Sequence, residues 1–232
     1  MRRNGRNIAR VDPVTENPRP VDGLDWHRRL VERLSAITAE WDAFATNGGR
    51  LPHIEDVLGE HQGNTGPWRV GLLVANGTST RLARRDFTET LDAVRAIPGL
   101  RAALWSQLDA GTELTEHEGP NAGVLRYHLG IDCPEGSALR VDDREVPYLD
   151  GEGILFDDTA PHAAWNHAGV PRITLFCEVD RPLPAIAGIR NRCTQFVLGL
   201  DPRRRGFLPL ADAWDEALNP GRRAPSAHRT VG

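Results

Sequence analysis

From Trp68 onward, short runs rich in Val, Leu, Ile, Phe and Tyr alternate with Gly, Pro, Asn and Asp, and this pattern restricts the fold more than any other feature. Each run has the length of a β-strand, and the residues between runs are those that form turns. The runs are 68–74, 103–108, 124–131, 138–141, 153–156 and 172–179. Many short strands in one chain favour a β-sandwich or a barrel.

Helices are expected on either side of this strand region. Residues 25–44 place apolar side chains at steps of three and four, which gives one apolar helical face able to cover a sheet. A second helix is expected over residues 86–96, because Pro98 and Gly99 follow it as a stop signal. A short third helix is expected around residues 211–218. The apolar residues of the first helix are Trp26, Leu30, Leu34, Ile37, Trp41 and Phe44.

The length of 232 residues suits one domain with a substantial core. We expect that domain to cover residues 23–218. The Arg-, Asn- and Pro-rich residues 1–22 are expected to form a disordered arm, and residues 219–232 a disordered tail. No internal repeat is present.

Charge and cysteine usage exclude several classes of protein. A formal charge of −4 gives no basic surface for nucleic acid, and no apolar run approaches the ~20 residues needed to cross a bilayer. The N-terminal residues lack the apolar core of a signal peptide. Cys133, Cys177 and Cys193 are too far apart for a zinc ribbon. We therefore expect a cytoplasmic protein with reduced thiols and no nucleic-acid or membrane partner, and the sequence leaves its oligomeric state open.

Basic side chains share one face of two expected strands. In residues 124–131, Arg126 and His128 alternate with apolar residues, so they lie on the same face. In residues 172–176, Arg172 shares a face with Thr174. Buried charges are costly unless they are paired, so a barrel interior lined in this way calls for an anion. A small dicarboxylate fits, because a guanidinium binds a carboxylate through two hydrogen bonds.

His117 and His162 lie in irregular segments at strand ends, where metal ligands are often displayed on a rigid sheet. Imidazole suits iron(II), which usually takes two histidines and one carboxylate. Here the first histidine is followed by Glu118 and Gly119, so the carboxylate two residues later is absent. Two other interpretations stay open: the site holds no metal, or His128 replaces His117 as a ligand.

Several stretches, taken in order, resemble the aspartyl/asparaginyl β-hydroxylase family over roughly residues 37–182. Single stretches are weak signals, but their order and spacing together are specific, and Arg172 follows His162 by ten residues. The matching stretches are Trp68-Arg69-Val70, Ile97-Pro98-Gly99-Leu100, Ser106-Gln107-Leu108-Asp109-Ala110-Gly111-Thr112, Gly119-Pro120-Asn121, Leu125-Arg126-Tyr127-His128-Leu129-Gly130, Gly151-Glu152-Gly153-Ile154-Leu155-Phe156-Asp157-Asp158 and His162-Ala163-Ala164-Trp165-Asn166.

The resemblance implies a mainly β chain with flanking helices and a double-stranded β-helix core, the jelly-roll or cupin-like fold. It implies an oxygenase that uses iron(II), 2-oxoglutarate and O2. His117 and His162 would be the iron ligands, as in family members that carry glycine in place of the ligand carboxylate. Gly119 occupies that position here.

The resemblance also assigns the cationic face. Arg172 and Ser106 would hold the distal carboxylate of 2-oxoglutarate, and Arg126 and His128 would contact the carboxylate beside the keto group. Asp157 and Asp158 fit either a role in orienting His162 or a turn or cap. Arg126, His128 and Arg172 are also the residues that strand alternation assigns to the inner face without the family.

The substrate is the least determined part of the hypothesis. The mammalian hydroxylases carry a further substrate-binding arginine two residues before the position of Arg126, and this chain has Val124 there. An aspartyl residue of an EGF-like domain is therefore not the expected substrate. A small molecule, an amino acid or a peptide natural product is expected instead. Trp68 and Trp165 either line its pocket or pack in the core.

The leading hypothesis is hydroxylation of a C–H bond with release of succinate and CO2. One alternative is a halogenase, because the missing carboxylate also vacates a place for chloride on iron. The other is a non-catalytic, cupin-like module that binds a dicarboxylate in the cationic barrel.

Overall fold

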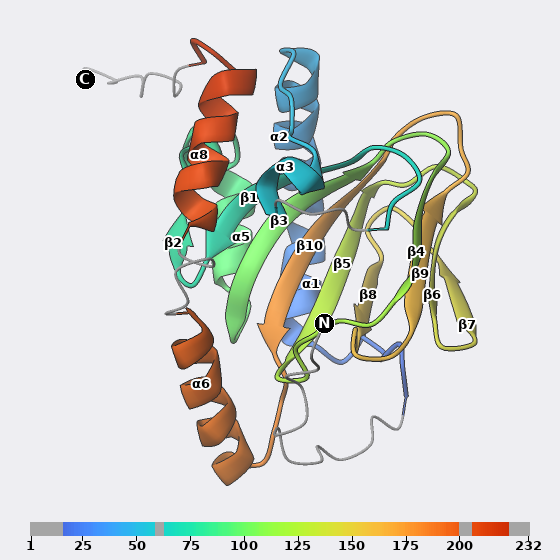
Figure 1. Cartoon of the computed structure of the whole chain (residues 1–232), viewed down its shortest axis with the longest axis vertical. Helices are drawn as coiled ribbons and strands as arrows, with labels where there is room; N and C mark the ends of the chain where they lie inside the picture. The colour runs from blue at the N-terminus through green and yellow to red at the C-terminus, as the bar shows by residue number, and fades with distance from the viewer. Residues whose placement is uncertain (1–15, 59–62, 200–205, 223–232) are drawn as a thin grey trace.

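Two antiparallel sheets form the centre of the molecule (Figure 1). The structure is a computed structural model, and it describes residues 16–58, 63–199 and 206–222. The larger sheet has the order β2-β1-β3-β10-β5-β8, and the smaller sheet has the order β4-β9-β6-β7. The strands are β1 (Trp68–Ala75), β2 (Thr78–Ser79), β3 (Leu100–Leu108), β4 (Thr112–His117), β5 (Val124–Asp132), β6 (Ser137–Val141), β7 (Arg144–Pro147), β8 (Gly153–Phe156), β9 (His162–Asn166) and β10 (Arg172–Asp180).

The two faces of the larger sheet have different environments. The face that holds Leu125, Tyr127 and Leu129 of β5 packs against helices in the main hydrophobic core. The opposite face looks toward the smaller sheet, and a second core lies between the sheets. Ile154 and Phe156 of β8 enter this second core, as does Leu139 of β6. The two facing sheets make the double-stranded β-helix that the resemblance implied.

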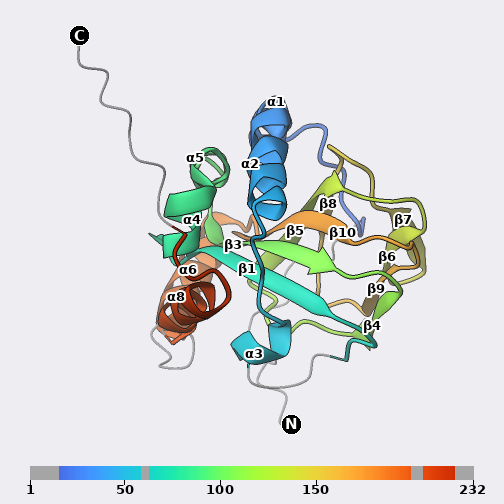
Figure 2. The ribbon, with the colours of Figure 1, turned by 90° about the horizontal axis from the view of Figure 1, so that it is seen from above.

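Helices cover the outer face of the larger sheet, as Figure 2 shows for α1 and α2. They do so because their apolar residues recur at helical spacing, and Leu30, Ile37 and Phe44 are almost fully buried against the sheet. Among the described residues, no helix is long and apolar enough to traverse a bilayer. The helices are α1 (Asp25–Glu32), α2 (Leu34–Thr46), α3 (Ile54–Leu58), α4 (Arg81–Asp86), α5 (Thr88–Arg95), α6 (Ala185–Gly199) and α8 (Phe207–Leu218).

All six expected strands are present, whereas β2, β4, β7 and β9 were not expected from the sequence. In β4 and β7 most side chains are exposed, so their sequences lack the apolar runs that mark a strand. The expected N-terminal helix is divided between α1 and α2 at Arg33. Helix α6 was also not expected, because its apolar residues show little one-sided periodicity.

The folded part extends beyond residues 23–218 at both ends. Arg19 pairs with Leu155 at the edge of the larger sheet, and Val21 is buried in the main core. At the other end, the Asn219 side chain is buried and bonds the backbone of Arg50. The remainder of the expected arm and tail, residues 1–15 and 223–232, lies outside the described residues.

Candidate metal and anion site

The two histidines that we expected to bind iron are direct neighbours in the smaller sheet. His117 is the last residue of β4, His162 is the first residue of β9, and the two are paired across the strands. Their ring centroids lie 4.2 Å apart. From the sequence we expected both residues in irregular segments at strand ends. They do lie at strand ends, but each is still part of its β-strand and paired with the other.

Both imidazoles are held by the same kind of hydrogen bond. His117 Nδ1 lies 2.7 Å from the carbonyl oxygen of Thr115, and His162 Nδ1 lies 2.9 Å from that of Ala160. A carbonyl oxygen only accepts, so Nδ1 carries the hydrogen and each Nε2 keeps its lone pair. Histidines that bind metal ions in proteins show this arrangement. Burial also lowers the pKa of His162, which favours the neutral, ligating form.

No side chain fits at residue 119. A Cβ atom built on Gly119 would overlap the carboxylate of Asp158, which is itself buried. The Gly119 amide also donates to the carbonyl oxygen of Asp158. The position at which the common iron site has its carboxylate is therefore filled by a carboxylate from another loop. Within the described residues, no set of three or more His, Cys, Asp or Glu side chains is arranged to hold a metal ion.

Arg172 is the basic residue of the inner face that the protein leaves incompletely paired. Its side chain is only 2% exposed, and its guanidinium lies over the Tyr148 ring at 4.4 Å. Within the described part of the chain, Nε and Nη1 of this guanidinium have no hydrogen-bond partner, and neither does the Thr174 hydroxyl two residues along. Buried donors of this kind are almost always satisfied in proteins, so the arrangement fits a bound carboxylate.

His128 is enclosed by aromatic rings rather than placed beside His117. Its Nδ1 lies 2.8 Å from the Tyr148 hydroxyl, and its ring contacts those of Tyr148, Phe156 and Phe176. Burial, and next the charge of Arg172, hold the pKa of His128 well below its usual range. Nε2 has no partner among the described residues. The structure thus brings together the pair His117 and His162 and leaves His128 outside it.

Arg126 faces the same interior but already has two acidic partners. Its Nε lies 2.7 Å from Asp158, and its Nη1 lies 2.9 Å from Glu178. The two carboxylates offset its charge, so this end of the face is not cationic. Of the two inner arginines, Arg172 is the one whose buried guanidinium nitrogens lack a partner in the described structure.

Four other residues were singled out from the sequence, and the structure does not place all of them at the site. Trp68 and Ser106 lie on the inner side, where the Trp68 indole donates to the Ser106 hydroxyl at 3.0 Å. Val124 is fully buried at the start of β5 and has no exposed surface. Trp165 lies on the opposite face of β9 from His162 and stacks on His167. The structure therefore does not bring Trp165 to the site.

A charged pair ties together the loops beside the two histidines. Arg181 lies 2.6 Å from Asp157, in the loop before His162, and donates to the carbonyl of Ala122, in the loop after His117. Asp157 also accepts from the backbone and hydroxyl of Thr159. Asp157 is thus a turn residue held by Arg181, whereas Asp158 contacts the site itself.

Two residues of the site were missed from the sequence. Glu178 continues the alternation of Arg172 and Thr174 along β10, so extending that pattern would have found it. Tyr148 lies just after β7 in a segment with no periodicity. Its role depends on tertiary contacts to His128 and Arg172, so no local signal was available.

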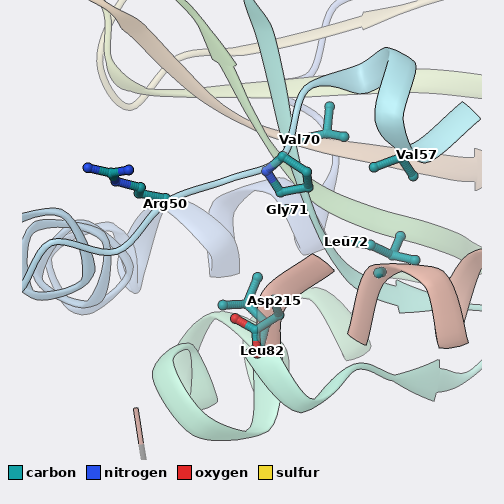
Figure 3. Close-up of a pocket in the computed structure, with 9 residues that line it drawn as sticks. Arg50, Val57, Val70, Gly71, Leu72, Leu82 and Asp215 are labelled. Carbon is teal, nitrogen blue, oxygen red and sulfur yellow. The ribbon is translucent and has the colours of Figure 1, made fainter. Parts of the chain in front are cut away.

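Two cavities of the described structure lie elsewhere. A cavity of about 20 Å³ lies between β1, α3, α4 and α8, lined by Val57, Leu72 and Leu82 among others (Figure 3). An open groove of about 420 Å³ lies between β2, α4 and α8. Neither is lined by a residue of the histidine pair or of the inner arginine face.

The described residues thus form a double-stranded β-helix that carries two paired histidines on one sheet and a buried arginine on the other. The family model described as aspartyl/asparaginyl beta-hydroxylase matches residues 32–182, which is more than half of the chain. The chain belongs to the aspartyl/asparaginyl β-hydroxylase family, as the sequence motifs indicated.

Curated relatives agree with this assignment. The ornithine lipid ester-linked acyl 2-hydroxylase of Rhizobium tropici is 32% identical over 171 residues, which cover 72% of this chain and 61% of the relative. The aspartate beta-hydroxylase domain-containing protein 2 of Homo sapiens is 34% identical over 95 residues, which cover 40% of this chain and 25% of the relative. The chain thus spans about three fifths of the first relative and a quarter of the second.

Solved structures with a similar arrangement include a predicted oxalate decarboxylase from Thermotoga maritima. The likeness has a TM-score of 0.37 at 13% identity and covers 52% of this chain and 86% of that one. A cupin domain of a transcriptional regulator from Enterobacter cloacae gives a TM-score of 0.35 at 18% identity, and it covers 50% of this chain and 98% of that one.

Proposed function

We propose that this chain is an iron(II)- and 2-oxoglutarate-dependent oxygenase that hydroxylates a C–H bond. The observation that carries the proposal is the pair His117 and His162. Both Nδ1 atoms are tied to backbone carbonyls, and neither Nε2 atom has a hydrogen-bond partner among the described residues. A structural role would not require two imidazoles to be fixed in this way at adjacent positions. A metal held by two histidines is the arrangement that these orientations support.

The fit to the cosubstrate rests on Arg172. Its unpaired guanidinium nitrogens and the unpaired Thr174 hydroxyl would bind one carboxylate of 2-oxoglutarate. When bound, iron(II) and 2-oxoglutarate activate O2 for C–H hydroxylation and release succinate and CO2. Tyr148 would hold the Arg172 side chain in place through its ring, and His128 would complete the wall.

Halogenation is the less favoured reaction because of Asp158. A halide in the space beside Gly119 would meet the carboxylate of Asp158, which already fills that space. Like charges in a buried site repel strongly. Arg126 does not relieve this repulsion, because Glu178 shares its charge. Turnover with and without chloride would separate the two reactions.

A non-catalytic dicarboxylate module is the second candidate, since Arg172 would serve it equally well. The paired histidines favour an enzyme, because an anion sensor needs no oriented Nε2 atoms. Iron(II)-dependent release of succinate from 2-oxoglutarate under O2 separates the two: the module would bind 2-oxoglutarate and release none.

The substrate we propose is an aliphatic carbon of a small molecule, an amino acid or a peptide natural product. The name of the Rhizobium tropici relative adds the acyl chain of an amino-acid-containing lipid to this set. Trp68 supplies an apolar, half-buried surface on the inner side. The test is to incubate the iron-loaded protein with 2-oxoglutarate, O2 and each substrate class, and to measure succinate and the mass gain of one oxygen. If no succinate forms with any of these substrates while iron and 2-oxoglutarate are both bound, the proposal is refuted.

A further inference from the structure

Helix α6 has one face that is tied to the candidate site. Its Asn191 side chain donates to the Gly123 carbonyl at 2.7 Å, and its Gln195 exchanges two hydrogen bonds with Asn121. Both partners lie in the loop that follows His117. A Cβ atom on Gly123 would overlap both amide side chains, so glycine is required for this close approach. The amide face of α6 therefore holds the loop of one candidate metal ligand.

The opposite face of α6 is apolar and basic, and it is exposed. Ile186 is 79% exposed and Ile189 is 55% exposed, the two highest values among large apolar side chains in the described residues. Arg190 is exposed as well, and spacings of three and four from Ile186 place all three side chains on one face. Figure 1 shows α6 projecting from the lower end of the molecule, below the sheets.

The charge of α6 contrasts with that of the whole chain. Its sequence AIAGIRNRCTQFVLG contains arginine but no acidic residue, whereas the chain has a formal charge of −4. Exposed isoleucines are costly in water, and the neighbouring Arg190 adds attraction for negative charge. Apolar side chains flanked by basic ones are typical of helices that lie on an anionic bilayer.

We propose that the exposed face of α6, formed by Ile186, Ile189 and Arg190, docks the protein on an anionic lipid bilayer. The two isoleucines would enter the interface between headgroups and acyl chains, and Arg190 would contact lipid phosphates. This departs from the sequence-based expectation of no membrane partner, which rested on the lack of a spanning segment. A peripheral helix needs no such segment.

The purpose of such docking rests on the proposed oxygenase function, because docking would bring the site to its substrate. The amide face of α6 holds the loop after His117, so docking through the other face would bring that loop close to the bilayer. An acyl-chain substrate would then be met at the bilayer surface. The docking itself is measurable without turnover.

The experiment is co-sedimentation of the full chain with vesicles. One set contains equal parts of phosphatidylcholine and phosphatidylglycerol, and the other contains phosphatidylcholine alone. We expect binding to the anionic set, weakened by high salt. The double variant Ile186→Glu/Ile189→Glu should lower the partition coefficient at least about tenfold, since it removes two apolar groups and adds two negative charges. Arg190→Gln should lower it roughly fivefold.

The matched control is Leu149→Glu/Val170→Glu. These side chains are 48% and 54% exposed and are not part of α6, and the two substitutions change the net charge by the same amount as Ile186→Glu/Ile189→Glu. The control should keep most of the binding. Equal losses in both double variants, or no binding of the unaltered protein to anionic vesicles, would overturn the proposal.

A second copy of the chain is the competing occupant. Light scattering after size exclusion would then show a dimer that Ile186→Glu/Ile189→Glu converts to a monomer. If the unaltered protein also failed to bind anionic vesicles, docking on a bilayer would be rejected. Iron-dependent succinate release without lipid is measured in parallel. Succinate release should be equal in all variants. Failure of the oxygenase proposal would therefore appear as absent succinate release, and failure of the docking proposal only as absent binding to the vesicles.

Discussion

Two arginines on one face of the larger sheet should respond in opposite ways to the same substitution. Arg172 and Arg126 both point into the space between the sheets, but only Arg126 is paired with carboxylates. We compare Arg172→Met with Arg126→Met in the absence of any ligand. Methionine keeps much of the volume and removes the charge.

The magnitudes follow from the partners of each side chain. Removing Arg126 leaves the buried carboxylate of Asp158 and the half-buried carboxylate of Glu178 without their cation, which costs about 3–5 kcal/mol of unfolding free energy. Removing Arg172 forfeits its contact with Tyr148, worth up to ~2 kcal/mol. It also removes a buried, incompletely paired charge whose desolvation costs several kcal/mol. The Arg172→Met protein should therefore be as stable as the unaltered one, or more stable.

The relative stability of the unaltered protein and Arg172→Met changes when 2-oxoglutarate is added. With a redox-inactive metal and 2-oxoglutarate in anaerobic buffer, the unaltered protein should gain stability by mass action. Arg172→Met should lose most of that gain, because losing one member of a buried charged pair weakens binding by roughly 2–5 kcal/mol. Metal binding itself should persist, since both histidines are intact.

Urea unfolding followed by circular dichroism measures the free energies, and calorimetric titration measures the affinity. If Arg172→Met destabilises the ligand-free protein as much as Arg126→Met does, then Arg172 is an ordinary structural residue. Unchanged 2-oxoglutarate affinity in Arg172→Met would likewise refute the anion site.

Three further predictions test the rest of the site. His117→Ala and His162→Ala should each abolish iron(II) binding and succinate release, with circular dichroism unchanged; retained metal binding in His117→Ala would make the ligand assignment wrong. Gly119→Ala should destabilise the protein by about 1–3 kcal/mol in urea unfolding, because the added methyl overlaps a buried carboxylate; an unchanged midpoint would contradict the close packing. Burial alone raises the pKa of Asp157, but Arg181 and Thr159 bring it below its ordinary value, so its stabilising effect is present above about pH 4 and lost as the pH falls through the lowered pKa. The stability difference between Asp157→Asn and the unaltered protein should thus shrink in acid, and a constant difference would exclude the ion pair as its cause.

The inner face of β5 and β10 was predictable because strand alternation is a local property. Arg126 and His128 on one side, with Leu125 and Tyr127 on the other, need only the period of two. The same holds for Arg172 and its apolar neighbours on β10. The structure has each of these side chains on the expected side.

What could not be predicted depends on residues distant in sequence. The expectation of an interior with two unpaired arginines did not include the partners of Arg126, because Glu178 is 52 positions and Asp158 is 32 positions away in the chain. Likewise, nothing local shows that His117 and His162 are paired across β4 and β9. Helix α6 went unnoticed because its amide face is defined by contacts with Asn121 and Gly123 rather than by apolar spacing.

Asp158 connects the features that the sequence presented separately. Its carboxylate pairs with Arg126, fills the space beside Gly119 and contributes to the electrostatic environment of His162. Glycine at residue 119 leaves the space that this carboxylate occupies, because a Cβ atom there would overlap it. A carboxylate charge is thus present beside Gly119, and it is paired with an arginine of the neighbouring sheet. Since Arg126 pairs with Asp158 and both act on the charge of His162, the histidine pair on the smaller sheet and the arginine face on the larger sheet are electrostatically coupled, and a substitution at Arg126 should disturb both.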